Sequence, residues 1–100
     1  MIRHIVLWKL YEQANNNTKQ ENAQQAKQVL EALNGKIQGL IKLEVGIDLL
    51  HSEQSADIAL YSEFASLDDL EHYQHHPEHV KIIPFMKSIC AERRVIDFES

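Results

Sequence analysis

Apolar and polar residues alternate along four stretches of this chain, and alternation with a period of two predicts β-strands with two different faces. In the first stretch one face carries Ile2, His4, Val6, Trp8 and Leu10, and the other carries Arg3, Ile5, Leu7 and Lys9. The other stretches follow the same rule. We expect strands over Ile2–Leu10, Leu40–Leu49, Ile58–Phe64 and Arg94–Phe98.

The two middle strands each present one face that suits a core. The second strand alternates an apolar set with a mostly polar one: Ile41, Leu43, Val45, Ile47 and Leu49 against Lys42, Glu44, Gly46 and Asp48. The third does the same: Ile58, Leu60, Ser62 and Phe64 against Asp57, Ala59, Tyr61 and Glu63. This pattern is typical of an antiparallel sheet that is covered on one side.

Helical spacing appears between the strands. After a polar loop over residues 12–17, Thr18 and Glu21 form a capping-box pattern, and the helix that follows should end at Asn34-Gly35. Ser66 is a second N-cap candidate, followed by an apolar stripe of Leu67, Leu70 and Tyr73. Pro77 should begin a further helix, and Pro84 should kink or split it. Its apolar side would consist of Val80, Ile83, Met86, Ile89 and Cys90.

The predicted order is β-α-β-β-α-β, which is the ferredoxin-like plan of the α+β class with a four-stranded antiparallel sheet. We expect residues 1–100 to form one such domain. Both helical segments then cover one face of the sheet. The other face would carry Ile5, Leu7, Ala59 and Tyr61 in the middle, with Arg3, Lys9, Asp57 and Glu63 as a charged rim. We expect a homodimer through this open face, and a monomer with a few exposed apolar residues is the alternative.

Composition excludes several functions. The net charge of −5 disfavours nucleic-acid binding, which needs a basic surface. No apolar run approaches the ~20 residues that a membrane-spanning helix needs, and the first residues predict a strand rather than a signal peptide. The one cysteine, Cys90, is expected to be a buried, inert thiol, and a cytoplasmic location fits it best.

The candidate chemistry lies near the second helical region. Four of the six histidines, His72, His75, His76 and His79, fall within eight residues and flank Tyr73 and Pro77. Neutral imidazole accepts a proton near pH 7, and a phenol donates a hydrogen bond to an oxygen. We expect Tyr73, His79 and His4 to meet between the sheet and the helices, with a ligand pocket lined by Trp8, Ile58, Leu60 and Val80.

With these residues in view, the chain resembles the stress-responsive dimeric α/β-barrel (Dabb) family. The resemblance spans nearly the whole chain and is most specific in the Tyr-x-x-His-Pro-x-His segment. It rests on Ile2–Leu7, Leu43–Gly46, Ser62–Phe64, Leu70–Val80 and Val95–Phe98. It implies a ferredoxin-like fold and a homodimer whose two sheets close a barrel.

The family does not fix a function, since many members have no assigned activity. One plant member, olivetolic acid cyclase, is a polyketide cyclase. The resemblance matches its catalytic Tyr and His to Tyr73 and His79, and its first-strand His to His4. A further His of that enzyme falls at Ile58 here, which weakens any transfer of its substrate. Such a cyclase would use His79 as general base and Tyr73 to stabilise an oxyanion, without a cofactor.

Other interpretations remain open at this point. Tyr73, His79 and His4 could be hydrogen-bonded core residues with no chemical role. The i,i+4 pairs His72/His76 and His75/His79 have metal-ligand spacing, but Pro77 interrupts the helix between His75 and His79, so no metal site is expected. Oxygen-dependent monooxygenase chemistry rests on fold analogy alone. The main hypothesis is a homodimer of unknown activity that binds a small apolar ligand.

Overall fold

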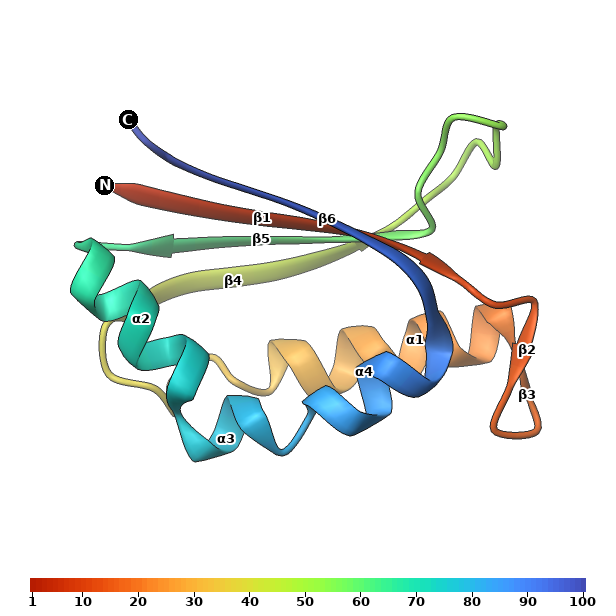
Figure 1. Cartoon of the computed structure of the whole chain (residues 1–100), viewed down its shortest axis with the longest axis horizontal. Helices are drawn as coiled ribbons and strands as arrows, with labels where there is room; N and C mark the ends of the chain where they lie inside the picture. Colours follow the sequence, from red (N-terminus) through yellow and green to blue (C-terminus); the bar gives the residue numbers. More distant parts are fainter.

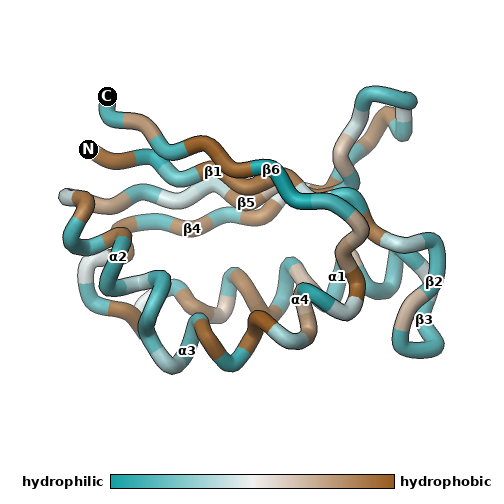
Figure 2. The backbone as a smooth tube through the Cα atoms, viewed as in Figure 1, coloured by the Kyte–Doolittle hydropathy of each residue, from teal (hydrophilic) through white to brown (hydrophobic).

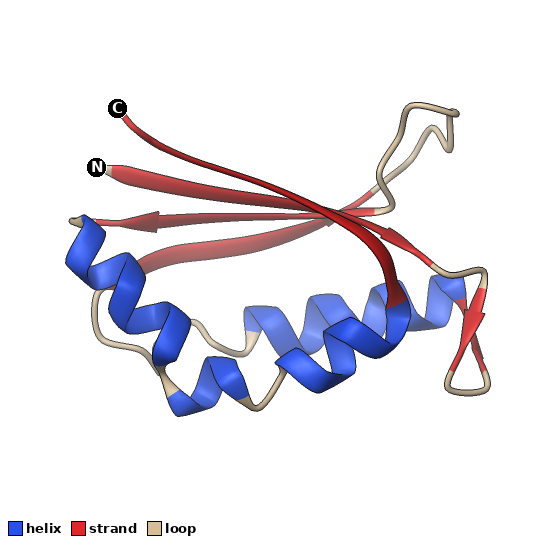
Figure 3. Ribbon diagram, in the orientation of Figure 1, coloured by secondary structure: helices blue, strands red, loops and turns tan.

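Four antiparallel strands form a sheet in the order β4-β5-β1-β6, and helices cover one of its faces (Figure 1, Figure 3). The computed structural model describes residues 1–100. The strands of this sheet are β1 (Ile2–Leu10), β4 (Leu40–Ile47), β5 (Ile58–Phe64) and β6 (Cys90–Glu99), and the helices are α1 (Lys19–Glu31), α2 (Leu67–His75), α3 (Pro77–Val80) and α4 (Ile83–Ile89). This arrangement confirms the predicted ferredoxin-like architecture. No helix is long and apolar enough to cross a membrane.

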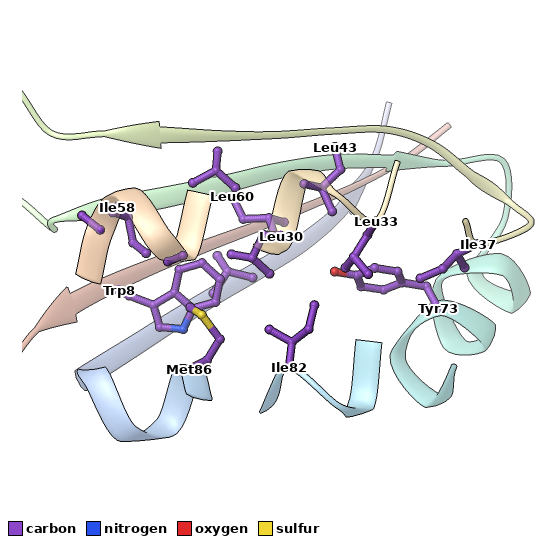
Figure 4. Packing of buried hydrophobic residues seen from close by; sticks show 14 of the residues in the cluster. Trp8, Leu30, Leu33, Ile37, Leu43, Ile58, Leu60, Tyr73, Ile82 and Met86 are labelled. Carbon is purple, nitrogen blue, oxygen red and sulfur yellow. The ribbon is translucent and has the colours of Figure 1, made fainter. Parts of the chain in front are cut away.

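The core lies between the sheet and the helices, as the alternation predicts. The helix-facing residues of β1 and β5 are all buried, among them Val6, Trp8, Leu60 and Phe64. They pack against apolar residues of the helical layer (Figure 4), including Leu30 of α1 and Met86 of α4. The hydropathy colouring shows apolar residues recurring along the strands and along the helices, while the loops at the right-hand end of the view are mostly teal (Figure 2).

Local capping explains where two of the helices begin. Thr18 Oγ1 accepts a hydrogen bond from the backbone N–H of Glu21, and the Glu21 carboxylate accepts one from the N–H of Thr18. Ser66 Oγ accepts a hydrogen bond from the N–H of Asp69 at the start of α2. Both predicted caps are confirmed, and each satisfies a backbone donor that has no partner inside its helix.

Strand β4 departs from simple alternation. Leu40 pairs with Phe64 and Lys42 with Glu63, so Ile41 is an extra residue opposite one position of β5. This β-bulge places Ile41, 52% exposed, on the side away from the helices, and the strand ends at Ile47, which leaves Leu49 exposed in the following loop. The prediction that Ile41 and Leu49 belong to the buried face is therefore wrong.

Several helix boundaries also differ from the prediction. Helix α1 ends at Glu31 and continues as turns to Gly35, which has a positive φ of 81°. The helical region after Pro77 is split, one of the two outcomes expected near Pro84: α3 ends at Val80 and Pro84 lies in the first turn of α4, where a missing N–H costs nothing. Leu67 is exposed rather than part of a buried stripe, and the predicted loop contains a small hairpin, β2 (Gln13–Ala14) and β3 (Asn17–Thr18).

The uncovered face of the sheet carries more apolar side chains than the prediction included. On β6, the residues that pair with Leu7, Ile5 and Arg3 of β1 lie on this face; they are Arg94, Ile96 and Phe98. They lie on the same face as the predicted Ile5, Leu7 and Ala59. Tyr61 is half-buried and its hydroxyl bonds to Arg3 and Glu63. Asp57 does not form part of the rim, since its carboxylate accepts the N–H of Leu10 and pairs with Lys19 of α1.

Candidate functional site

A cavity of about 470 Å³ opens between the sheet and the second helical region. Its wall is mostly apolar and combines residues of β1, β5, α1 and α4, such as Val6, Trp8, Leu30 and Met86. Figure 4 shows Trp8, Leu30, Ile82 and Met86 lying close together, with the Tyr73 ring entering from α2. The cavity exists because α3 and α4 are short and are separated by a turn at Lys81-Ile82.

The three predicted aromatic site residues all lie in the wall of this cavity. The Tyr73 ring lies 4.5 Å from the His79 ring and 6.2 Å from the His4 ring, measured between centroids. His4 and Tyr73 are buried, at 3% and 1% exposure, and His79 is half-buried. The structure thus brings together residues from β1, α2 and α3 that are far apart in the sequence. Their chemical roles remain predictions.

The environment of His79 suits a neutral imidazole. Its Nδ1 lies 3.1 Å from the carbonyl oxygen of Gln74, which can only accept, so Nδ1 carries the proton and Nε2 has the free lone pair. Burial lowers the pKa of His79 below the usual 6.5. The hydrogen bond to Gln74 raises this pKa in part, and the nearby His4 and Arg93 lower it further. His79 is therefore unprotonated at neutral pH and able to accept a proton.

Tyr73 differs from an ordinary core tyrosine because its hydroxyl makes no hydrogen bond within the chain. Burial raises the pKa of Tyr73 well above 10, and the Arg93 charge opposes this only in part. The phenol stays protonated over the whole physiological range. Its oxygen points into the layer between Leu33 and Ile82 rather than toward solvent (Figure 4), where it can donate a hydrogen bond to a molecule in the cavity.

His4 is held in place by an acid on the neighbouring strand. Its Nδ1 lies 2.5 Å from Asp97 Oδ1, and β6 places Asp97 directly opposite His4. The carboxylate accepts the Nδ1 proton and fixes the ring, so Nε2 of the neutral ring has the free lone pair. The predicted contribution of His4 thus includes a partner, Asp97, that the sequence analysis did not identify.

The structure places two of the four predicted pocket residues, Trp8 and Leu60, in the cavity wall. Ile58 is buried in the core outside the cavity wall, between Trp8 of β1 and Ile47 of β4. Val80 is 45% exposed, since the last turn of α3 directs it outward.

Arg93 is a cavity residue that the sequence analysis missed. Strand β6 begins at Cys90, and a β-bulge at Ala91 places Arg93 opposite Trp8, on the helix-facing side. Its positive charge acts on Tyr73, His79 and Cys90 alike. Continuing the apolar alternation of Val95 backwards by two residues would have assigned Arg93 to that face.

The remaining histidines lie outside the cavity. His72 and His75 are exposed, and the rings of His72 and His76 are 5.5 Å apart. His76 instead serves as a helix cap, since its Nδ1 accepts the N–H of Glu78 at the start of α3. No group of three or more His, Cys, Asp or Glu side chains is arranged to hold a metal ion.

Fold and cavity together define a ferredoxin-like protein with an aromatic, histidine-containing pocket beneath its sheet. The chain belongs to the Dabb family: the model of the stress responsive A/B barrel domain matches residues 2–100. This confirms the resemblance inferred from the motifs. No curated protein matches the sequence significantly.

Solved structures support the same assignment. A dimeric protein of unknown function with a ferredoxin-like fold from Bacteroides fragilis is 36% identical, with 99% of this chain and 95% of that chain covered and a TM-score of 0.86. A second dimeric ferredoxin-like protein of unknown function, from Thermobifida fusca, is 25% identical over 99% and 90% of the two chains, with a TM-score of 0.82. The hydroxynitrile lyase of Passiflora edulis shares the fold at 19% identity, 97% and 90% coverage and a TM-score of 0.80.

Proposed function

We propose that this protein is a homodimer in which each protomer binds a small, largely apolar molecule between the sheet and the helices. The observation that carries the proposal is the cavity of about 470 Å³, whose apolar wall is interrupted only by a few polar groups. Ligand pockets commonly measure about 300–1,000 Å³ and have this composition. Two relatives described as dimeric support the oligomeric state.

Adjacent residues of β6 provide a direct test of the dimer. Ile96, 58% exposed, lies on the uncovered face, and Val95, 41% exposed, lies on the helix-facing side. We expect Ile96→Lys to shift the particle mass from dimer to monomer in light scattering, because it places a charge in an apolar contact, whereas Val95→Lys leaves the mass unchanged. A wild-type monomer at micromolar concentration would contradict the proposal.

The only tryptophan of the chain reports on ligand binding, because Trp8 lines the cavity. We expect a neutral apolar ligand such as 1-decanol to change its fluorescence saturably. Ile83→Phe, which fills the cavity, should weaken binding, and Val80→Phe, which adds the same bulk outside it, should not. Equal binding by all three proteins would show that the cavity is not the site.

A second candidate function is a cofactor-free cyclase, favoured by the free lone pair of His79 beside the unbonded hydroxyl of Tyr73. His79 Nε2 would remove a proton from a carbon between two carbonyls, and Tyr73 would donate a hydrogen bond to the resulting enolate oxygen. The carbanion would attack a distant carbonyl of the same chain and form a carbon–carbon bond. The new alkoxide would take the proton back from His79.

The chain offers a matched control for this candidate. His75 makes the same kind of contact as His79, Nδ1 to a backbone carbonyl at 3.0 Å, but lies outside the cavity. With a linear poly-β-keto ester as substrate, we expect ultraviolet absorbance of a cyclised product with wild type and His75→Gln, and its loss with His79→Gln. Unchanged cyclisation by His79→Gln would exclude His79 as the base.

A further inference from the structure

We propose that Arg93 selects the ligand of the cavity, and that this ligand is an amphipathic anion: an apolar chain or ring that ends in a carboxylate. The inference rests on the proposed ligand-binding function and names its chemical class. It concerns the wall of the cavity formed by β6, which the His79 and Tyr73 chemistry does not use.

The first observation is the position of Arg93. The β-bulge at Ala91 turns Arg93 to the same side as Trp8, directly across from it, and both residues line the cavity. If Ala91 were instead paired as a regular strand residue, strict alternation from Cys90 would direct Glu92 inward in place of Arg93. Bulges of this kind redirect single side chains next to binding sites.

The second observation is that Arg93 has no partner. All seven ion pairs of the chain involve other residues, and no hydrogen bond involves the Arg93 guanidinium, since the one bond between Arg93 and a side chain is accepted by its backbone carbonyl. A guanidinium presents a planar fork of donors that matches the two oxygens of a carboxylate. At the edge of a low-dielectric cavity its field extends inward and favours an anion.

The third observation is the contrast along the cavity. One end carries the Arg93 guanidinium, with Lys87 as a second cation in the wall. Glu92 also borders this end, but its register opposite Lys9 assigns its side chain to the other face of the sheet. The rest of the wall is formed by apolar side chains such as Val6, Leu60 and Ile82. A carboxylate at Arg93 therefore allows an attached hydrocarbon to extend along the apolar wall toward Tyr73. A purely apolar ligand would leave the guanidinium unused, and a small inorganic anion would leave the apolar wall unused.

The test compares decanoate with 1-decanol, which share the hydrocarbon chain and differ in the head group. Trp8 fluorescence at low salt gives the dissociation constants for the full-length wild type, Arg93→Gln and Arg94→Gln. Arg94 is the matched control: it has the same charge on the same strand but lies on the opposite face, across from Leu7. Since the Arg93 guanidinium makes no hydrogen bond or ion pair within the chain, its replacement should leave the fold intact.

We expect Arg93→Gln to weaken decanoate binding about 2- to 5-fold, the range for an exposed ion pair. Decanol binding should stay within about 1.5-fold in all three proteins, and Arg94→Gln should bind both ligands like wild type. Added salt should weaken decanoate binding to wild type more than to Arg93→Gln. If Arg93→Gln weakens both ligands equally, or neither, the inference is wrong while ligand binding stands. If neither ligand affects Trp8 in wild type, the inference and the proposed ligand-binding function fail together.

Discussion

Replacing Tyr73 by Phe tests whether the Tyr73 hydroxyl stabilises the fold or serves a function in the cavity. The Tyr73 ring is 1% exposed and packs 5.1 Å from the Phe64 ring, so its aromatic body contributes to the core. The hydroxyl, in contrast, has no hydrogen-bond partner in the chain. Tyr73→Phe keeps the packing and removes only a polar atom that borders the cavity and has no hydrogen-bond partner in the chain.

The expected size of the effect follows from this difference. Deleting a hydroxyl that makes a hydrogen bond costs about 1 kcal/mol of unfolding free energy, whereas deleting an unpaired one costs nothing or stabilises by up to about 1 kcal/mol. For a domain of this size, 1 kcal/mol corresponds to roughly 4–8 °C in melting temperature. We therefore expect Tyr73→Phe to melt at the wild-type temperature or a few degrees above it, and to lose cyclisation if Tyr73 stabilises an enolate.

Tyr61→Phe is the internal reference for that measurement. The Tyr61 hydroxyl donates to Glu63 Oε2 at 2.5 Å and accepts from Arg3, so its loss should cost about 0.5–1.5 kcal/mol. Urea denaturation at one fixed protein concentration, with both variants and wild type, gives the comparison. A loss of more than about 1.5 kcal/mol in Tyr73→Phe would refute the reasoning, because the hydroxyl would then have a structural role.

Three further predictions concern other parts of the chain. Because burial lowers the pKa of His79, the unfolded state binds more protons than the folded state at acidic pH. The unfolding free energy should therefore fall as the pH drops below about 6.5. Denaturation curves of His79→Gln should show a weaker dependence of this free energy on pH. Burial raises the pKa of Cys90 to about 11, so iodoacetamide at pH 8 should modify the native thiol far more slowly than the thiol in denaturant, as mass spectrometry would show. Thr18→Ala removes the cap of α1 and should cost about 1 kcal/mol in urea denaturation; an unchanged midpoint would mean that this end of the helix is held by tertiary contacts.

Local rules account for the parts of this structure that the sequence predicted well. The alternation along β1 depends only on strand geometry, and it placed His4 correctly on the helix-facing side. The capping box at Thr18 is a local hydrogen-bonding pattern, and it marked the start of α1 within one residue. The approach of Tyr73 to His79 followed from the helix start at Pro77 and from the family resemblance.

The errors have a common physical origin in irregular backbone. The bulges at Ile41 and Ala91 each insert one unpaired residue, and no residue type identifies such an insertion when pairing partners are unknown. The first assigned Ile41 to the wrong face. The second lies in the part of β6 before Arg94, where the predicted strand began, so Arg93 was left outside that strand. Asp97 was missed for a related reason, since its contact with His4 depends on a register that only the assembled sheet fixes.

The bulge at Ala91 also links two surfaces on opposite sides of the sheet. A slip of the pairing by one residue turns every side chain of a strand to the other face. If Ala91 paired with Lys9 in place of Glu92, Arg93 would leave the cavity wall, and Ile96 and Phe98 would leave the outer face at the same time. Loss of Ala91 would only make the ladder regular, whereas insertion of a residue within the strand beyond it should be excluded among functional descendants of this chain, because it would change both surfaces together.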